Sequence, residues 1–399
     1  MMEPKIRFSS SNILYEEKTL SEISTINPKT NVPLEFEYVD LESVSGTEMT
    51  NHRTEHKATA PSRAQRLAKK GDIFYQTVRP YQKNNYFFDM DDDNYVFSTG
   101  YAQIRPSIYG KYLFTLLQND SFLKQVLDNC AGTSFPAINP SVLSRLSLRI
   151  CKDKQEQQAI ASYFTSLDSQ ISASTSRLAS LKQMKAASLQ AMFPQEGETV
   201  PKIRFKGFEG EWKTCPLYHF AKKRIEKNTK MLYNITLTNS AEFGIIDQRN
   251  FFDHEISNSE NINGYYVVRD HDFVYNPRIS SSAPVGPINQ NKLGYTGVMS
   301  PLYLVFEING INRDFLEIFF HTTLWHKYMF DNGNTGARFD RLAISDEDFM
   351  KMPIPDIDIE EQQAIASYFT SLDRQISLQS QRLEKLQQIK SACLDKMFV

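Results

Sequence analysis

One stretch of this sequence occurs twice, almost unchanged. Residues 156–172 read EQQAIASYFTSLDSQIS and residues 361–377 read EQQAIASYFTSLDRQIS, so only Ser169 and Arg374 differ between the copies. A shorter echo, PKIRF, stands at residues 4–8 and again at 201–205. A repeat of about 200 residues is too long for a solenoid unit, which is one small supersecondary element. The sequence therefore predicts two tandem modules that give one chain the symmetry of a homodimer.

The repeated segments have the apolar spacing of coiled-coil helices. Their apolar residues alternate at steps of three and four, which is typical of the seam of a helix pair. An aspartate three residues before the glutamate of each EQQ predicts a capping box at each helix start. The predicted helices occupy residues 151–194 and 356–399, and the predicted pairing residues are Ile160, Phe164, Leu167, Ile171, Leu178, Leu181, Ile365, Phe369, Leu372, Ile376, Leu383 and Leu386.

Pairing of the two like helices is the simplest way to bury both apolar stripes. The internal symmetry favours an antiparallel pair, although the spacing itself does not fix the orientation. The alternative is that each helix packs on its own globular domain. Residues 172–176 read SASTS, which is poor helix material, so we expect the first helix to bend or fray there.

The two remaining segments, residues 1–150 and 195–355, read as mixed α and β domains. Short β-rich runs at 36–41, 95–98 and 302–308 are separated by Gly, Pro, Asn and Asp turns. GDIFY at 71–75 resembles HDFVY at 271–275, and an arginine follows each, which indicates one fold with different surfaces. The predicted class is α+β: two mixed domains joined by two long helices that pair as an antiparallel coiled coil, with an internal pseudo-two-fold repeat.

Composition excludes several classes of protein. No apolar run is long enough to span a membrane, and the N-terminal residues lack the apolar core of a signal peptide. The four cysteines form no CxxC pair, so neither a zinc site nor a thiol redox site is predicted, and reduced thiols favour the cytoplasm. With a net charge of −2, any nucleic-acid surface must be a local patch.

The motifs of common catalytic sites are missing from the sequence. There is no Walker loop, GxGxxG, GxSxG or HExxH, and Asn276-Pro277 continues into Arg278 rather than into the Pro-aromatic pair that holds a flipped base in amino-methyltransferases. The acidic run at 89–93 lacks the glycine and the closing glutamate of a calcium loop, so a solvated turn is the better interpretation. We predict no catalytic, cofactor-binding or metal-binding residue in this chain.

Basic and polar side chains gather at matching places in the two halves. Cations neutralise phosphates, while Arg and Asn can bond the edges of guanine and adenine. Gly333 and Gly336 would let a backbone approach a partner closely. Charge runs are usually solvated faces and the glycine loop is as readily a plain connection, so each signal alone is weak. The candidate DNA-binding residues are Arg63, Arg66, Lys69, Lys70, Thr77, Arg79, Lys83, Asn84, Asn85, Asn276, Arg278, Ser280, Asn334, Thr335 and Arg338.

Taken together, these features resemble the specificity (S) subunit of type I restriction–modification systems, over the whole chain. The resemblance rests on PKIRF followed by Trp212, the strand FEYVD at 36–40, the run from Arg63 to KGDI at 70–73, and the loop NTG at 334–336. Its most specific feature is MPIP at 352–355 leading into EQQ at 361–363. The first half departs from it, with LSLR at 146–149 in place of MPIP and a shortened glycine loop, GTS, at 132–134.

The resemblance implies a non-catalytic reader of double-stranded DNA. Each unlike segment would be a target recognition domain that reads one half of a bipartite, asymmetric site, and the helices would fix the spacer. Two methyltransferase (M) subunits would dock on the helices and bring S-adenosylmethionine for adenine methylation. Restriction (R) subunits would add ATP- and Mg-dependent translocation and cleavage, although a methylation-only system is equally compatible with the sequence.

Within each domain the candidates divide by role. Arg63, Arg66, Lys69 and Lys70 are expected on phosphates, which position a protein without specifying sequence. The residues expected on base edges are Thr77, Arg79, Asn84 and Asn85 in the first half, and Asn276, Arg278, Asn334 and Arg338 in the second. Two rival functions stay open at this point: an enzyme in its own right, and a coiled-coil scaffold that binds only protein.

Overall fold

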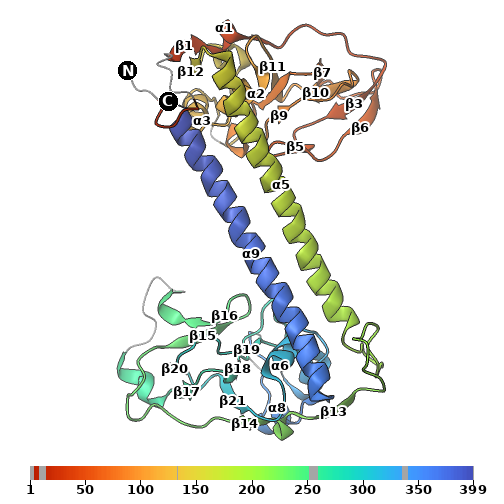
Figure 1. The fold of residues 1–399 in the computed structure, drawn as a ribbon, viewed down its shortest axis with the longest axis vertical. Coiled ribbons are helices and arrows are strands. Elements are labelled where there is room, and N and C mark those ends of the chain that lie inside the picture. Colours follow the sequence, from red (N-terminus) through yellow and green to blue (C-terminus); the bar gives the residue numbers. More distant parts are fainter. Residues whose placement is uncertain (1–3, 9–14, 133, 251–258, 335–339, 399) are drawn as a thin grey trace. The chain divides into compact units, whose positions relative to one another are not determined.

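The computed structural model describes residues 4–8, 15–132, 134–250, 259–334 and 340–398 (Figure 1). The chain divides into two compact units, each with its own core. The first unit contains residues 1–176 and 380–399, and the second contains residues 177–379. The divisions fall inside the two long helices, so each helix contributes one end to each unit. Among the described residues, no helix is long and apolar enough to cross a membrane.

The first unit is built around the four-stranded sheet β2-β11-β8-β9. Strand β8 is buried at every position, as expected for a central strand covered on both faces. A second sheet has the order β6-β3-β10-β7, and β1 pairs with β12 just before the first long helix. The strands are β1 Tyr15–Thr19, β2 Ser24–Ile26, β3 Glu35–Val39, β4 Val44–Ser45, β5 Glu48–Met49, β6 Arg53–His56, β7 Ala64–Leu67, β8 Ile73–Gln76, β9 Tyr86–Phe87, β10 Tyr95–Ser98, β11 Tyr101–Pro106 and β12 Ser147–Cys151. The helices are α1 Leu20–Ile23, α2 Gly110–Leu117, α3 Asp120–Asp128, α4 Pro140–Leu143 and α5 Lys154–Ala191.

The second unit repeats this plan with fewer strands. Its central sheet has the order β14-β21-β18-β19, and β13 pairs with β22 just before the second long helix. The strands are β13 Lys213–Pro216, β14 Ala221–Lys223, β15 Leu237–Ser240, β16 Gly244–Asp247, β17 Tyr266–Val268, β18 Phe273–Tyr275, β19 Ile288–Gln290, β20 Gly297–Met299, β21 Leu304–Ile308 and β22 Pro353–Asp356. The helices are α6 Arg313–Phe320, α7 His326–Asn332, α8 Asp346–Met350 and α9 Ile359–Met397.

The two central sheets correspond strand for strand. In each, the strand that carries GDIFY or HDFVY pairs with the strand that precedes an amphipathic helix, α2 or α6. The two units differ outside the central sheet. The first unit adds a second four-stranded sheet, and the second unit adds two two-stranded sheets, β15-β16 and β17-β20. The predicted fold class is confirmed, with two mixed domains of one plan joined by two long helices.

The long helices α5 and α9 pair in antiparallel orientation within each unit. In the first unit, the Tyr163 hydroxyl lies 3.5 Å from the Cys393 sulfur, and Lys390 pairs with Asp168 at 2.6 Å. In the second unit, Lys185 pairs with Asp373 at 2.5 Å, and the Ser188 and Tyr368 hydroxyls are 2.9 Å apart. Residue numbers rise on one helix as they fall on the other, which confirms the predicted orientation.

The apolar residues of α5 and α9 pack both against the other long helix and against the core of a domain. Ile160 and Phe164 share one buried cluster with Met397 of α9 and with residues of the first sheet, and Phe369 shares another with Met192. Both packing alternatives raised by the sequence are therefore realised at once. Five of the predicted pairing residues are only half-buried: Ile171, Leu178, Ile376, Leu383 and Leu386.

The expected fraying at residues 172–176 is absent, because α5 is helical throughout Lys154–Ala191. Ser174 is buried, and the Thr175 hydroxyl donates to the backbone carbonyl of Ile171 at 2.9 Å. Such back-bonding lets a small hydroxyl residue sit within a helix without exposing an unpaired group. Low intrinsic helix propensity is thus overridden by the surroundings of this segment.

An arginine from each PKIRF echo holds the glutamate at the start of a long helix. Arg7 donates to both carboxylate oxygens of Glu156 at 3.1 and 2.8 Å, and Arg204 does the same to Glu361 at 2.7 Å for each bond. The Glu156 and Glu361 side chains are only 0% and 2% exposed. The predicted capping boxes are therefore corrected: Asp153 does cap α5 through the Gln155 N–H at 2.8 Å, but the glutamates bind arginine instead.

The same echo touches the opposite helix and packs an aromatic ring in both units. The backbone N–H of Ile6 donates to the carbonyl of Lys396 at 3.1 Å, and that of Ile203 donates to Ala191 at 2.9 Å. The ring of the phenylalanine that ends each echo packs edge-on against the tyrosine of the adjacent helix. PKIRF is therefore a clamp that joins the start of one long helix to the end of the other.

Candidate nucleic-acid interface

In the first unit, three segments meet where strand β8 ends. Beyond β8, Val78 forms an antiparallel bridge with Ala137, which bridges in turn to Ala131. The backbone N–H of Arg79 donates to the carbonyl of Pro136 at 2.7 Å. These pairings fix residues 77–85 beside residues 131–138, with Thr133 outside the described residues. We call this the first strand-end surface.

The second unit builds the corresponding surface in the same way. Beyond β18, Arg278 bridges to Arg341, and Asn334 bridges to Ala343. We call residues 276–280, 334 and 340–343 the second strand-end surface. When the two bridges are aligned, Arg278 occupies the position that Val78 has in the first unit. Arg79 and Arg278, which the sequence suggested were equivalent, therefore differ by one position. The two surfaces share a backbone plan but present different side chains.

Arg79 lies at the centre of the first strand-end surface. Its backbone is left-handed, with φ 53°, and its guanidinium carbon lies 4.5 Å from the centre of the Phe135 ring. Lys83, at the other end of the short turn 80–82, is also left-handed, with φ 54°. Non-glycine residues in this region are uncommon and cluster at functional sites, where the surrounding structure holds them.

Lys83 and Asn84 lie at the edge of this surface and already have protein partners. The Lys83 ammonium pairs with Asp120 at the start of α3. The Asn84 side-chain oxygen accepts the Gly46 N–H at 2.9 Å, which ties the turn to the β4-β5 hairpin. Both residues are half-buried, so each can present part of its side chain to a ligand.

Thr77 and Asn85, predicted to bond base edges, face the interior and are 4% and 2% exposed. The Thr77 hydroxyl donates to the carbonyl of Gly100 at 2.8 Å, and the Asn85 oxygen accepts the Gln76 N–H at 2.8 Å. Buried polar groups need such partners, because an unpaired one costs free energy. In this structure the two side chains hold the strand end in place.

Replacing Asn85 by alanine is expected to lower the free energy of unfolding by about 1–3 kcal/mol, because the buried Gln76 N–H loses its acceptor. Urea unfolding followed by circular dichroism would measure the loss. The matched control is Asn84→Ala, whose bond to Gly46 is exposed and should matter less. Equal losses for the two variants would contradict the assignment.

The basic run before β8 divides between solvent and protein. Arg63, Lys69 and Lys70 are exposed, and Lys70 pairs with Asp91 at 2.7 Å, a contact that raises the pKa of the ammonium. Arg66 on β7 is half-buried, and burial lowers the pKa of its guanidinium. Arg66 lies on β7 of the second sheet, whereas Arg79 lies just after β8 of the central sheet. The basic candidates of the first unit therefore come from both sheets.

On the second strand-end surface, Arg278, Ser280 and Asn334 are exposed. The Arg278 side chain is 65% exposed, and the carboxylate of Asp340 lies 3.9 Å from it. Asn276 is buried and donates to the carbonyl of Asn239 at 2.8 Å, as part of an amide network. Two further candidates, Thr335 and Arg338, lie outside the described residues.

The aspartate shared by GDIFY and HDFVY is structural. Asp72 accepts the Arg105 Nε–H at 2.8 Å, and Asp272 accepts the Arg224 Nε–H at 2.6 Å. A backbone N–H three residues earlier also donates to each carboxylate. In each unit the aspartate therefore stabilises the turn that precedes the central strand, β8 or β18, whose far end forms the strand-end surface.

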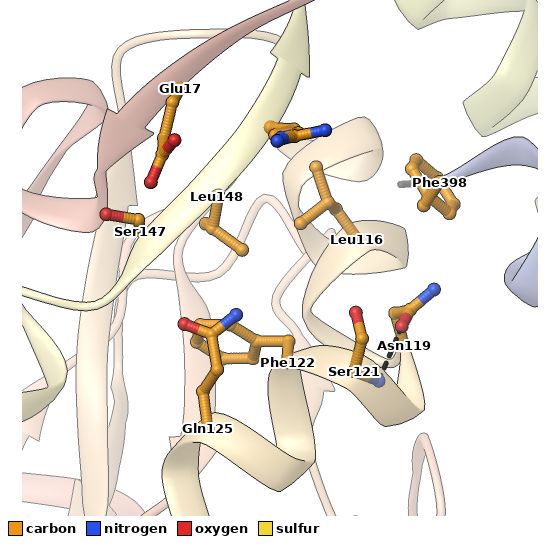
Figure 2. A pocket seen from close by; sticks show the side chains of 10 residues that line it. Glu17, Leu116, Asn119, Ser121, Phe122, Gln125, Ser147, Leu148 and Phe398 are labelled. Carbon is orange, nitrogen blue, oxygen red and sulfur yellow. Dashed lines mark hydrogen bonds between the residues drawn. The ribbon is translucent and has the colours of Figure 1, made fainter. Parts of the chain in front are cut away.

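A separate cavity of about 310 Å³ in the first unit lies where the end of α9 meets α3 (Figure 2). The Asn119 side chain accepts the Ser121 N–H at 2.7 Å and so caps α3. It also donates to the carbonyl of Leu394 at 2.8 Å, which links the start of α3 to α9. Phe398 closes one side. Among residues 4–8, 15–132, 134–250, 259–334 and 340–398, no cluster of His, Cys, Asp or Glu could hold a metal ion.

Part of the chain is similar in sequence to known proteins. Residues 12–183 match the family described as the type I restriction modification DNA specificity domain. The chain is 36% identical over 139 residues to the specificity subunit of the type I restriction enzyme HindI from Haemophilus influenzae, a match that spans 33% of this chain and 30% of that relative. The first half of the chain is therefore similar to the DNA specificity domain of type I restriction–modification systems, and the matched stretch spans less than a third of the length of the curated relative.

Solved structures have the same fold over the full length. The type I restriction–modification S subunit from M. genitalium matches with a TM-score of 0.62 at 14% identity, covering 100% of this chain and 99% of that one. A chain from a structure on complex assembly and conformational transition of the type I R-M system matches with a TM-score of 0.54 at 19% identity, covering 97% and 98%. These matches show that the fold, with its two domains and two long helices, is shared.

Proposed function

We propose that this chain is the DNA-reading subunit of a type I restriction–modification complex, with each recognition domain reading one half of a bipartite, asymmetric site. The domains would be residues 1–150 and 195–355, linked by the helical segments 151–194 and 356–399. The observation that carries the proposal is the pair of strand-end surfaces, which have one backbone plan and different exposed side chains. Identical surfaces would suit a palindrome, whereas unlike surfaces suit two unlike half-sites.

The exposed face of the repeated helices supports docking of two like partner subunits. Positions at which the copies are identical yet exposed in both units include Ser162 and Ser367, and Thr165 and Thr370. Burial in this chain does not account for their identity, because their side chains face solvent. We propose that each exposed face receives one methyltransferase subunit, and that restriction subunits join the complex through it.

In this proposal the chemistry belongs to the partner subunits. The methyltransferase subunits would carry S-adenosylmethionine and transfer its methyl group to adenine, and the restriction subunits would use ATP and Mg. This chain would bind DNA and set the separation of the half-sites, and the assembly would act on DNA in the cytoplasm.

The test is single-molecule methylation sequencing of DNA from a host that lacks other methyltransferases. The host expresses this chain together with a type I methyltransferase subunit from the same source. The expected result is a split, asymmetric motif with methylated adenine that disappears when this chain is omitted. A methylation pattern that is independent of this chain would contradict the proposal and favour a scaffold that binds only protein.

Arg79→Ala is expected to weaken reading of one half-site only. An arginine that bonds a base edge contributes about 1–3 kcal/mol of discrimination at one position, so binding to the intact site should fall about tenfold or more. Fluorescence anisotropy with DNA in which either half-site is scrambled would locate the loss. Arg278→Ala is the matched control and should affect the other half-site. A uniform loss on unrelated sequences, with a smaller salt slope, would make Arg79 a phosphate contact instead.

A further inference from the structure

Phe135 is an exposed aromatic residue that lies outside the buried hydrophobic cores of the first unit. Its side chain is 62% exposed, and it belongs to none of the buried hydrophobic clusters of the first unit. A phenylalanine left largely in water forgoes the stabilisation that burial of its ring would contribute. A single exposed ring can be incidental, so its surroundings decide whether it has a role.

The backbone on both sides of Phe135 is fixed. Ala131 and Ala137 exchange backbone hydrogen bonds at 2.9 and 3.0 Å, and Pro136, the next residue, accepts the Arg79 N–H at 2.7 Å. Gly132 has φ 86°, and a Cβ there would lie 3.2 Å from the Phe135 carbonyl oxygen, so the turn needs glycine. The ring is therefore presented from anchored backbone.

The neighbours of the ring suit a nucleic acid. The Arg79 guanidinium lies over it at 4.5 Å, and the nearby turn carries Tyr81, which is 51% exposed, and Lys83, whose half-buried side chain pairs with Asp120. An aromatic face beside cations can stack on a base while the cations meet phosphates. A surface made for an apolar partner protein would instead be depleted of charge at its centre.

We infer that Phe135 is a stacking residue that contacts a base or wedges between two base pairs of the half-site read by the first unit. This inference rests on the proposed DNA-reading function and adds to it one residue and one mode of contact. Apolar side chains that enter a base step partly unstack it and kink the duplex. Phe135 would then select for base steps that deform easily, in addition to the edges bonded by Arg79.

The experiment uses the full chain in complex with its methyltransferase subunits. The probes are duplexes carrying the motif found by methylation sequencing, with 2-aminopurine placed at successive positions of each half-site. Phe135→Ala removes the ring, and Phe135→Trp keeps an aromatic face. Phe330→Ala is the matched control, because it truncates a phenylalanine of similar exposure on α7 of the second unit. Thermal unfolding and size-exclusion chromatography verify folding and assembly of each variant.

We expect the wild-type complex to raise 2-aminopurine fluorescence at one step of one half-site. Phe135→Ala should lose this signal and about tenfold or more in affinity, as for loss of one base–aromatic stack. Its salt slope should stay unchanged because no ion pair with phosphate is lost. Phe135→Trp should keep both signal and affinity, and Phe330→Ala should resemble the wild type.

Two outcomes would overturn the inference. Wild-type affinity and fluorescence in Phe135→Ala would show that the ring does not meet DNA, while leaving the DNA-reading function intact. Failure of Phe135→Ala to assemble with methyltransferase subunits would assign the ring to a protein contact. Failure of the wild-type complex to prefer its motif would instead defeat the proposed function itself.

Discussion

Replacing Arg204 by methionine is expected to lower the free energy of unfolding of the second unit by about 3 kcal/mol. Arg204 holds both oxygens of Glu361, a carboxylate that is 2% exposed, and removing one partner of a buried ion pair leaves an uncompensated charge. Arg204 also donates to the carbonyl of Gly210, so a second bond is lost. Denaturant unfolding followed by circular dichroism would measure the change.

Two controls separate the charge effect from loss of packing. Lys202→Met makes a similar substitution two residues away, where the ammonium is exposed and 3.8 Å from Glu198, so stability should change by less than about 1 kcal/mol. Combining Arg204→Met with Glu361→Leu removes both charges and should recover most of the loss, since buried pairs can often be replaced by apolar residues. A double variant as unstable as the single one would show that the clamp acts through shape alone.

Inserting one helical turn of four residues into both long helices is expected to lengthen the DNA spacer by one or two base pairs. The insertions are placed after Ser176 and after Gln379, where the compact units divide, so the helix contacts within each unit are untouched. Four residues add about 6 Å of helix, and one base pair rises about 3.4 Å. Methylation sequencing would show the new spacer directly.

Both half-sites should remain unchanged in that variant, because neither strand-end surface is altered. An insertion into α5 alone leaves α9 one turn shorter, so we expect lower stability than for the matched insertion. An unchanged spacer, or a new half-site sequence, would contradict the role of the helices as a ruler between the domains.

The helices were the easiest part of this fold to predict. Their stripe of Ile, Phe and Leu repeats over many turns, and periodicity over such a length distinguishes a helix from a strand. The stripe does not name its partner, however. Ile160 and Phe164 pack near Met397, more than 200 residues away in the sequence, together with the first sheet. Periodicity records that a face is buried but not what covers it.

Polar residues were harder to assign because the same side chain can serve DNA or the protein backbone. Asn84 and Asn85 are identical in type and adjacent, yet Asn85 accepts a buried N–H and Asn84 lies at the edge of the surface. The role of PKIRF was also beyond reach, since nothing in the sequence links Arg7 to Glu156 across 149 positions. Phe135 carried no signal, because exposure of a ring depends on how its loop is anchored.

Under the proposed DNA-reading function, the matching clamps would allow one recognition domain to be exchanged for another. Arg7 with Glu156 and Arg204 with Glu361 form the same joint, and each joint precedes the same helical sequence. Genetic recombination between the two repeated stretches could therefore replace one domain by another without redesigning a helix or a docking face. If each domain reads one half-site as proposed, a single crossover would create a new combination of half-sites, faster than successive changes to individual contacts.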